Sequence, residues 1–549
     1  YIRAFRWASD RIGTEGIICF VTNGAWLDSN TADGFRHELE QEFSAIYVFN
    51  LRGNARTQGE QRRKEAGNIF KSGSRTPVAI TLLVKKAGYD GKAVIHYHDI
   101  GDYLTREEKL AKIAAFGDYT ALPWTMLEPN EHYDWISQRN VAFSDFVPLN
   151  AEEETAIFSM RSLGLGTNRD VWCYNFSFDQ LEKNIQTSID FYNNEVERFK
   201  EAKPKDNSIE IAHFINYDKT KFSWSYQQIK DLEKIQKYSF DKASIYTSTY
   251  RPFILEHVYF NRTLNNRVYR QPLIFPTSSH KNVVINVTGI GVTKDFSCLI
   301  LKTMPDIQVF ANGQCFPLYY YEKADNGKQC NLLEIGQATE AGYVRKEAVT
   351  DAGLELFRNH YEDDSISKED VFYYVYGILH SPKYREDYAA DLKKMLPRVP
   401  LAPDFWAFSK AGRELAHWHL DYESVEPWPV EEERQPQGDK DDFAYYHVEK
   451  MRFPKKGEKG SIIFNPFITF KNIPLEVYDY VVNGKSALEW IMERYAITVD
   501  KDSGIRNDPN DWCREHDDPR YIYDLVRRII RVSMETNKIV AALPDFEEA

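Results

Sequence analysis

The sequence predicts an α/β segment followed by a larger α+β segment with a helical C-terminal part. Residues 1–90 alternate between apolar residues at helical spacing and continuous apolar runs of strand length. Residues 151–350 combine one long helical pattern with many short strand-like runs, and helical spacing dominates again from about residue 350. Because 549 residues are too many for one core, we expect two to four domains.

Composition limits the functional classes. Hydrophobic residues make up 43% and aromatic residues 14% of the chain, which supports several packed cores and leaves rings that can stack on bases. The formal net charge of −13 argues against a protein coated in positive charge, such as a histone-like binder. One basic cleft remains compatible with this charge, because salt confines the field of each charge to about 10 Å.

The cysteines show neither a disulfide framework nor a metal-ligand pattern. They predict reduced, mostly buried thiols of a cytoplasmic protein. No apolar run approaches the roughly 20 residues that a membrane-spanning helix needs, and no signal peptide is recognised. The chain starts inside a predicted helix, which suggests a fragment of a longer protein. The scattered cysteines are Cys19, Cys173, Cys298, Cys315, Cys330 and Cys513.

Residues 1–90 predict half of an α/β sheet domain whose first strands are missing. Apolar spacing predicts a helix over Tyr1–Ile12, and the run GIICFVTN predicts a strand covered on both faces. Ser29 or Thr31 is the expected cap of the next helix. AIYVFNL and TPVAITLLVKK predict two further strands, separated by a polar loop over Arg52–Ser74.

Residues 91–150 predict an ordered connector. KAVIHYHDI is strand-like, TREEKLAKIAAF predicts a short amphipathic helix, and three prolines interrupt the remainder. Charged and aromatic residues are mixed without a low-complexity run, which favours an ordered bridge.

A polar loop on a rigid element is predicted at Gly164–Phe178, GLGTNRDVWCYNFSF. Its two glycines loosen the backbone, and VWCYNF predicts a buried strand. The polar side chains between them belong to Thr167, Asn168, Arg169 and Asp170. Such a loop suits recognition and is equally compatible with an ordinary turn.

The richest pattern for contacts with bases and phosphates lies at Thr249–Pro276, after the predicted long helix SFDQLEKNIQTSIDFYNNEVERFKEA. Arginine and asparagine offer bidentate geometry for guanine and adenine edges. The polar residues of this pattern are Arg251, Asn261, Arg262, Asn265, Asn266, Arg267, Arg270 and Gln271. KNVVINVTGIG, FSCLIL, IQVFA and CFPLYYY then predict short strands that close a sheet.

The C-terminal part predicts helices interrupted by one polar excursion. FYYVYGILHSPKYREDYAADLKKMLPRVPL is helical, broken by Pro382 and stopped by Pro397, and FWAFSKAGRELAHWHLDYE is a second amphipathic helix. The acidic run Glu426–Asp442 is predicted to be flexible. YYHVEKMRFP and GSIIFNPFITFKNI predict a hairpin, and VYDYVVNGKSALEWIMERY and DLVRRIIRVSMETNKIVAAL predict closing helices.

The order of GIICFVTNGAWL, a helix, IYVFNLRGNAR, a loop and GSRTPVAITLLVKK resembles the second half of an amino-methylating DNA methyltransferase domain. In that family a glycine-rich cofactor loop and an Asn-Pro-Pro-Tyr motif lie upstream, and neither is present here. The resemblance implies a partial Rossmann-like methyltransferase sheet without the parts that bind S-adenosylmethionine and hold the flipped adenine.

A second resemblance covers roughly residues 150–545. YRPFILEHVYFNR, CFPLYYY, YVYGILHSPKYREDYAADLKKMLPRVPL, VNGKSALEWIMERY and SGIRNDPNDW resemble the C-terminal specificity domain of type ISP single-polypeptide restriction-modification enzymes. In that family one chain joins a nuclease, a translocating helicase-like ATPase, an adenine methyltransferase and this target recognition domain. The implied domains are 1–90 (end of the methyltransferase), 91–150 (connector) and 151–549 (target recognition), with a helix-rich subregion 350–425 and C-terminal hairpin and helices at 443–549.

The resemblance implies a parent enzyme of bacterial phage defence. It would recognise a short asymmetric sequence in double-stranded DNA, methylate adenine N6 with S-adenosylmethionine, and cleave unmethylated DNA after translocation that uses ATP and Mg. Its partners would be DNA and the upstream regions of the same polypeptide, with no membrane. The chain alone is expected to bind none of these cofactors and to be inactive.

The expected DNA contacts come from three segments. The predicted residues are Thr167, Asn168, Arg169, Arg251, Asn261, Arg262, Asn265, Asn266, Arg267, Arg270, Lys450, Lys455 and Lys456, with Lys459 as a further phosphate contact. Asp170 is expected to cap or orient its loop. Two alternatives stay open: a methyltransferase of another phage-defence system without a helicase in the chain, and a module whose aromatic C-terminal half docks a protein.

Other motif-like patterns are interpreted as structural. NPF at 465–467 lacks the second proline of the adenine-methylating motif and predicts a hairpin turn. Gly484-Lys485-Ser486 has Asp479 where a phosphate-binding loop needs glycine and follows a predicted helix. Pro305-Asp306 lacks the acid-x-Lys pair of a nuclease. His96, His98, His417 and His419 have no acidic or cysteine partners at ligand spacing.

Overall fold

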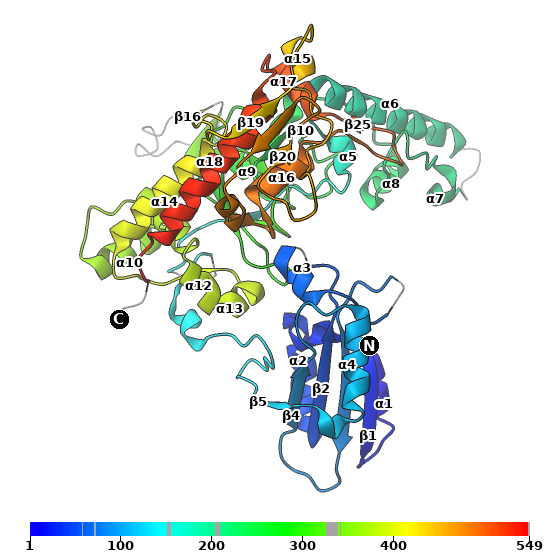
Figure 1. The fold of residues 1–549 in the computed structure, drawn as a ribbon. Helices are drawn as coiled ribbons and strands as arrows, with labels where there is room; N and C mark the ends of the chain where they lie inside the picture. The colour runs from blue at the N-terminus through cyan, green and yellow to red at the C-terminus, as the bar shows by residue number, and fades with distance from the viewer. Residues whose placement is uncertain are drawn as a thin grey trace. The chain divides into compact units, whose positions relative to one another are not determined.

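The computed structural model describes residues 1–57, 59–70, 73–150, 155–203, 209–324, 339–340 and 342–546. The chain divides into two compact units (Figure 1). Unit 1 comprises Tyr1–Phe146, Ile290–Phe296 and Tyr384–Arg398. Unit 2 comprises Val147–Gly289, Ser297–Lys383 and Val399–Ala549.

Unit 1 is built on a mixed five-stranded sheet in the order β1-β3-β2-β4-β5 (Figure 1). β2 and β4 are parallel, and the other neighbouring pairs are antiparallel. The strands are β1 (Gly16–Asn23), β2 (Ala45–Arg52), β3 (Val78–Lys85), β4 (Val94–Asp99) and β5 (Thr125–Leu127). β4 and β5, which come from the segment predicted as a connector, therefore belong to this sheet.

Apolar side chains cover both faces of the central strand β2. Ile46 and Val48 pack with Phe5 of α1 and Leu39 of α2, whereas Phe49 packs with side chains of α4. The helical elements of unit 1 are α1 (Ile2–Ser9), η1 (Gly24–Leu27), η2 (Asn30–Ala32), α2 (Asp33–Glu42), α3 (Gly59–Glu65), α4 (Arg106–Phe116), η3 (Tyr119–Ala121), η4 (Val141–Asp145) and α13 (Ala389–Lys394). α12 (Pro382–Asp387) starts at the proline that was expected to break a longer helix.

Two local predictions for unit 1 are wrong. β1 is an edge strand whose only neighbour among the described strands is β3, so Ile17 is 65% and Val21 51% exposed instead of covered. The N-cap of α2 is Ala32, without a side-chain cap, because Ser29 and Thr31 belong to the preceding 3₁₀ turn and their hydroxyls bond each other at 2.9 Å.

Unit 2 is a mixed α+β unit with two four-stranded sheets, ordered β13-β9-β10-β8 and β12-β11-β14-β7, beside smaller pairings. Together with unit 1 it confirms the predicted fold class. Its strands are β6 (Val147–Pro148), β7 (Ser162–Leu163), β8 (Tyr174–Asn175), β9 (Ile245–Arg251), β10 (Ile254–Tyr259), β11 (Val284–Val287), β12 (Cys298–Leu301), β13 (Met304–Pro305), β14 (Gln314–Pro317), β15 (Tyr319–Lys323), β16 (Thr339–Glu340), β17 (Tyr343–Glu347), β18 (Arg398–Val399), β19 (Glu431–Arg434), β20 (Ile462–Ile463), β21 (Ile468–Lys471), β22 (Val481–Val482), β23 (Lys485–Ser486), β24 (Thr498–Val499) and β25 (Arg506–Asn507).

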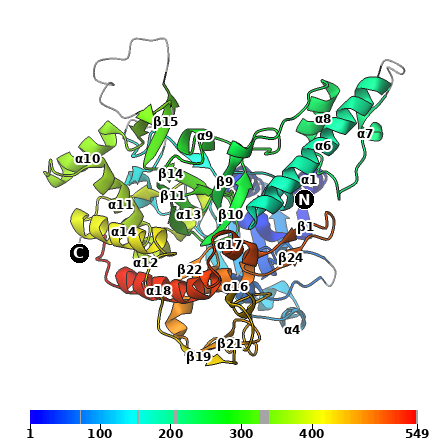
Figure 2. The same ribbon diagram turned by 90° about the horizontal axis from the view of Figure 1, so that it is seen from above.

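The helices of unit 2 follow the predicted apolar spacing in most places. α6, the predicted long helix, lies beside α8, and buried side chains of both join one core cluster (Figure 2). The helical elements are α5 (Asp170–Cys173), α6 (Phe178–Ala202), α7 (Ile211–Phe214), α8 (Tyr226–Glu233), η5 (Lys242–Ser244), α9 (Gln271–Ile274), α10 (Asp351–Tyr361), α11 (Lys368–Ile378), α14 (Phe405–Leu420), α15 (Asp442–Tyr445), η6 (Leu475–Asp479), α16 (Ala487–Arg494), α17 (Pro509–Glu515) and α18 (Tyr521–Ala541).

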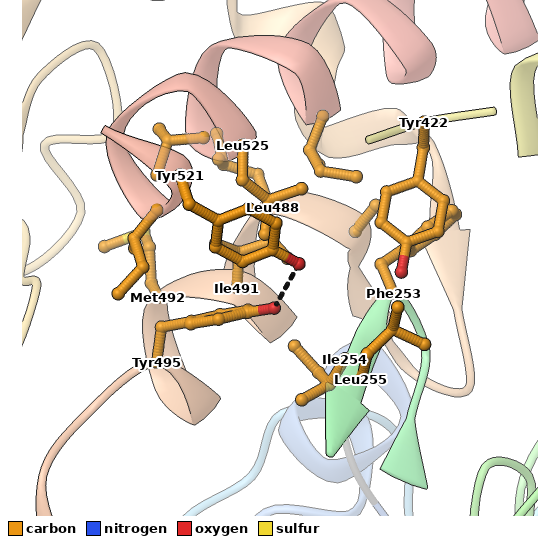
Figure 3. Close-up of a cluster of buried hydrophobic side chains, with 14 of the residues drawn as sticks. Phe253, Ile254, Leu255, Tyr422, Leu488, Ile491, Met492, Tyr495, Tyr521 and Leu525 are labelled. Carbon is orange, nitrogen blue, oxygen red and sulfur yellow. Dashed lines mark hydrogen bonds between the residues drawn. The ribbon is translucent and has the colours of Figure 1, made fainter. Parts of the chain in front are cut away.

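The main core of unit 2 packs against the β9–β10 hairpin. Figure 3 shows the hairpin residues Phe253 and Ile254 near Tyr422, Tyr495 and Tyr521, with the hydroxyls of the last two 3.3 Å apart. These tyrosines follow α14, end α16 and start α18, so three helices that are distant in sequence anchor one hairpin. The hairpin is therefore a rigid base for residues on its other side.

Five segment predictions for unit 2 are wrong. VWCYNF forms one turn of helix, α5, and the two-residue strand β8, and IQVFA forms turns at the end of β13. Glu426–Asp442, predicted to be flexible, contains β19, which pairs with β21. YYHVEKMRFP contributes only an isolated bridge to the hairpin of β20 and β21, and VYDYVVNGKS forms η6 and two short strands instead of a helix.

Candidate nucleic-acid interface

The loop over residues 164–170 runs as an additional strand between two other segments, and we call it the 164–170 loop. On one side the Leu165 amide donates to the carbonyl of Pro305 at 2.8 Å, and the Ile307 amide donates to that of Leu165 at 2.9 Å. On the other side Gly166 and Arg267 exchange two amide hydrogen bonds of 2.9 Å. The expectation that two glycines loosen this backbone is therefore wrong.

Gly164 is required by close approach rather than by conformational freedom. A Cβ atom at this position would lie 2.7 Å from the carbonyl carbon and oxygen of Asp306. Side-chain atoms do not approach backbone atoms this closely in well-packed proteins. The loop reaches its position beside Asp306 only because this residue has no side chain.

Within the loop, Asn168 is exposed between two buried neighbours. Thr167 is fully buried, and its hydroxyl bonds the Asp170 carboxylate and accepts from the Arg169 amide at 3.1 Å. Asn168 has the left-handed φ of 55° and is exposed. Arg169 returns to the interior, so Asn168 projects outward between two anchored neighbours.

The guanidinium of Arg169 joins the loop to two other segments. It is 6% exposed and donates to the carbonyl of Leu264 at 2.9 Å and to the side-chain oxygen of Gln228 on α8 at 2.8 Å. A weaker bond of 3.4 Å reaches Asn266. Among the described residues no carboxylate pairs with it, and burial lowers the pKa of Arg169.

A second, largely buried arginine contacts the end of the loop, in a group that we call the Arg251 cluster (Arg251, Asp306 and Asp170). The Arg251 guanidinium is 2.8 Å from the Asp306 carboxylate and 3.8 Å from that of Asp170. It also stacks on the ring of Tyr250, 3.8 Å from its centroid. Burial by itself would lower the pKa of Arg251, but electrostatic interactions with Asp306, Tyr250 and Asp170 raise it.

Glu256, on β10, adds a buried carboxyl near the same cluster. It is 2% exposed, and its side chain accepts from the Asn507 amide at 3.0 Å. Burial raises the pKa of Glu256 to about 7. A hollow of about 310 Å³ lies between Glu256 and the Asp170 end of the loop.

The predicted contact residues at 261–270 divide into two groups. Asn265 is buried and accepts from the Asn261 amide at 2.9 Å, while the Asn261 side chain caps Thr263 at 3.0 Å. These two asparagines shape the turn. The exposed residues of the segment are Arg262, Asn266, Arg267 and Arg270. Gln271 is buried and donates to the carbonyl of Leu163 at 2.8 Å.

Two exposed residues of the same segment lie next to the loop. The Asn266 amide faces the carbonyl of Thr167 at 3.5 Å, and Arg267 pairs directly with Gly166. Asn168, Asn266 and Arg267 therefore form a continuous polar face from two chain segments. The sequence predicts each of these residues, and the structure brings them together.

The predicted lysines lie on a separate segment, residues 450–459, which we call the lysine segment. Lys450, Lys455 and Lys456 are exposed, whereas Lys459 forms an ion pair of 2.9 Å with Glu489. The segment has one isolated bridge, between Arg452 and Ile463, and otherwise turns. The side chains of Lys450, Lys455 and Lys456 are therefore solvated charges, whereas Lys459 is paired.

A hollow of about 660 Å³ lies beside the 164–170 loop. The loop, Tyr217–Trp224 and Asp500–Ser503 line it, and Lys219 pairs with Asp502 across exposed side chains at 2.9 Å. Its carboxylates come from Asp170, Asp306, Asp500 and Asp502. This excess of acidic groups disfavours a phosphate in the hollow, so we expect phosphates at the exposed arginines instead.

Several residues of this site are missing from the sequence prediction. Asp306 and Gln228 anchor the two buried arginines from 55 and 59 positions away, and no local pattern connects them. Asp500 and Asp502 belong to a hairpin turn whose approach to the loop also depends on tertiary structure. Only Asp170, predicted to orient the loop, was recognisable, because it follows the polar residues directly.

The patterns interpreted as structural have structural partners. The Asn465 side chain accepts from the amides of Phe467 and Ile468, both at 2.9 Å, as a hairpin turn requires. His419 is buried and bonds the Tyr376 hydroxyl at 2.6 Å, and His96 stacks on Tyr47. In the part of the chain that the structure describes, no cluster of His, Cys, Asp and Glu suits a metal ion.

The five described cysteines are not joined to one another by disulfides, and all except Cys19 are buried. Cys330 lies outside the described residues. Among the helices that the structure describes, none has the length and apolar character to cross a membrane.

Comparison with known proteins identifies the domain. A family model described as the Type ISP C-terminal specificity domain matches residues 156–525. No curated protein sequence is significantly similar to the chain.

Solved structures match the chain over its full length. A nuclease-deletion mutant of the Type ISP restriction-modification enzyme LlaGI in complex with a DNA substrate mimic is 39% identical, with a TM-score of 0.86. The ATP-dependent Type ISP enzyme LlaBIII bound to DNA is 36% identical (TM-score 0.85), and a DrdV–DNA complex is 31% identical (TM-score 0.81). The chain covers 48%, 34% and 52% of these three chains, so it spans about half of their length or less.

Proposed function

This chain belongs to the Type ISP restriction-modification family, and from this premise we propose that unit 2 recognises a specific sequence in double-stranded DNA. One observation carries the proposal: the whole chain matches a Type ISP enzyme in complex with a DNA substrate mimic at 39% identity. The specificity-domain match over residues 156–525 includes the 164–170 loop, the Arg251 cluster and the lysine segment.

The exposed polar face has the chemistry that sequence recognition needs. Asn168 and Asn266 supply amides, and Arg267 supplies a guanidinium that matches the edge of guanine. Arg262, Arg270 and the exposed lysines would neutralise phosphates, which adds affinity without sequence information. The two kinds of contact come from different segments, so substitutions can separate them.

The activity of the complete enzyme follows as a wider proposal. We propose that the parent methylates adenine N6 with S-adenosylmethionine, and translocates on and cleaves unmethylated DNA with ATP and Mg. The matched LlaBIII enzyme is ATP-dependent, and the matched chains are about two to three times as long as this one. The partners of unit 2 would be DNA and the upstream regions of the polypeptide, in the bacterial cytoplasm.

Residues 1–90 are proposed to be part of the second half of the methyltransferase domain, whose sheet also includes β4 and β5 of residues 91–150, and residues 151–549 are proposed to be the target recognition domain. S-adenosylmethionine supplies the methyl group when it is bound in such enzymes. The 549 residues contain no Asn-Pro-Pro-Tyr stretch, so the side chains that would hold the target amine are absent from this chain. We therefore expect the chain alone to lack methylation, ATPase and cleavage activities.

The test is a selection from a pool of duplexes with a randomised central region, with the 549-residue chain as bait. The account predicts one enriched sequence. The affinity for this sequence should fall steeply between about 50 and 200 mM salt, because phosphate contacts release counterions. Enrichment of no sequence, or binding that is independent of salt, would contradict DNA recognition and favour a protein-docking module.

A further inference from the structure

Asn168 is the outward-facing residue of a loop that is otherwise fixed. Its two neighbours, Thr167 and Arg169, are buried and hydrogen-bonded. No hydrogen bond joins the Asn168 side chain to another described residue, so its amide is available to a ligand. Asparagine tolerates the left-handed φ of 55° better than most residues, which makes the turn compatible with a polar tip.

We propose that Asn168 recognises one base of the DNA target through its amide, and that Arg169 and Arg251 position the loop without touching DNA. This inference rests on the proposed function of unit 2. It changes the expected role of the two arginines, which the sequence predicts as direct contacts.

The base edge that suits Asn168 is that of adenine. An asparagine amide offers one acceptor oxygen and a donor NH₂ group side by side. In the major groove adenine offers the complementary pair, the N6 donor and the N7 acceptor. Because Arg267 lies directly beside the loop, an adjacent guanine edge or phosphate is the natural second contact.

Arg169 is unable to serve as a direct contact in this structure. Its donors are directed to Leu264, Gln228 and Asn266, and the atom without a partner, Nε, is buried. A DNA contact would require the guanidinium to leave these acceptors and would open the connection to α8. The bonds instead fix where the backbone turns at Asn168.

Arg251 acts on the loop through the carboxylate of Asp170. Its guanidinium pairs with Asp306, which is 1% exposed, and lies close to Asp170 at the end of the loop. The backbone of Asp306 also pairs with that of Leu165. One arginine thus links the end of the loop to the strand on which the loop rests.

The experiment compares variants on the enriched sequence of the selection above. Asn168→Ala should lose about 10- to 100-fold in preference at one base position, while its affinity for unrelated duplex DNA stays unchanged. Arg251→Lys keeps the charge but shortens the reach to Asp170. It should weaken preference at that same position, because it acts through the loop.

A double variant separates positioning from contact. If Arg251 only positions Asn168, then Asn168→Ala combined with Arg251→Lys should show the same preference loss as Asn168→Ala alone. Thr167→Val, an isosteric change that removes one anchor of the loop, should behave like Arg251→Lys. It also provides a second positioning variant if Arg251→Lys fails to fold.

The outcomes distinguish this inference from the function on which it rests. If the unaltered chain enriches no sequence, DNA recognition itself fails. If it enriches one and Asn168→Ala keeps full preference at every position, then Asn168 recognises no base. If Arg251→Lys loses preference at a different position, and its loss adds to that of Asn168→Ala, then Arg251 contacts DNA directly.

Discussion

The 164–170 loop and the lysine segment are both predicted to contact DNA, yet the structure holds them in opposite ways. In the loop, three of the four polar side chains are anchored by hydrogen bonds, and one points outward. In the lysine segment, Lys450, Lys455 and Lys456 are solvated and lie on turns. Buried charged side chains fix the conformation of the loop, whereas the lysine side chains of the segment are exposed and are not held in one position.

This difference matches two physical requirements. A hydrogen bond to a base edge depends on distance and angle, so the side chain that makes it must be held in place. Attraction to phosphate depends mainly on the presence of charge within a Debye length. We therefore expect the loop to carry sequence discrimination and the lysine segment to carry affinity.

The largest expected effect is the loss of stability when the ion pair beside the loop is broken, compared with the ion pair of the lysine segment. At pH 8, above the pKa of about 7 to which burial raises Asp306, Asp306→Asn removes the charge that compensates the largely buried Arg251, and should lower the free energy of unfolding by about 3–5 kcal/mol. The matched change in the lysine segment, Lys459→Met, breaks the more exposed pair with Glu489 and should cost less than about 1 kcal/mol. Urea denaturation measures both, and equal losses would remove the distinction.

Next in size is a pH dependence that arises beneath the loop. Burial raises the folded-state pKa of Glu256 from 4.5 to about 7, so its stabilising contribution is complete below about pH 4.5 and is lost as the pH rises through 7. Glu256→Gln should remove this loss and make the protein more stable than the unaltered chain at pH 8, by roughly 2–3 kcal/mol.

Urea denaturation between pH 5 and pH 8 tests this expectation, with the exposed Glu458→Gln of the lysine segment as the matched control. The unaltered chain and Glu256→Gln should differ little in free energy of unfolding at pH 5. A Glu256→Gln variant whose stability follows the unaltered chain at every pH would show that this carboxyl titrates normally.

Two glycines give a smaller contrast. Gly164→Ala places a Cβ atom 2.7 Å from the Asp306 carbonyl, and we expect a loss of about 1–3 kcal/mol in the free energy of unfolding. Gly460→Ala, just after the lysine segment, meets no atom within 4 Å and should change stability by less than about 0.5 kcal/mol. Thermal unfolding measures both variants, and an equal decrease of their midpoints would contradict the packing argument.

The smallest effect on stability is expected for the exposed lysines. Replacing Lys455 and Lys456 together by alanine should leave the thermal midpoint unchanged within error, because both are solvated. The affinity should fall equally for enriched and unrelated duplexes, with the salt slope reduced by about 2 if both contact phosphates. A loss confined to the enriched sequence would assign sequence recognition to this segment.

Much of the fold could be predicted because its signals are local. The apolar spacing of α6, α14 and α18 and the apolar runs of β2 and β3 determine these elements without information from elsewhere in the chain. The failures lie where tertiary neighbours decide. β19 became a strand because β21 offers a partner, and VWC became a helical turn because Arg169 and Cys173 are fixed by contacts with Leu264.

The candidate site shows the same division. The sequence identifies the composition of the 164–170 loop, but side-chain direction depends on partners more than 50 residues away, such as Gln228 and Asp306. Arginine is predicted as a contact because its guanidinium fits bases and phosphates, yet the same geometry suits a buried carbonyl or carboxylate. Only the structure separates these uses for Arg169, Arg251 and Arg267.

The central claim is that the 164–170 loop provides sequence discrimination and the lysine segment provides affinity for DNA. The most direct test is the ratio of affinities for the enriched and an unrelated duplex, measured for Asn168→Ala and for the Lys455→Ala, Lys456→Ala double variant. The account predicts that the ratio falls about 10- to 100-fold for Asn168→Ala and stays constant for the lysine variant. A constant ratio for Asn168→Ala, with a reduced ratio for the lysine variant, would contradict it.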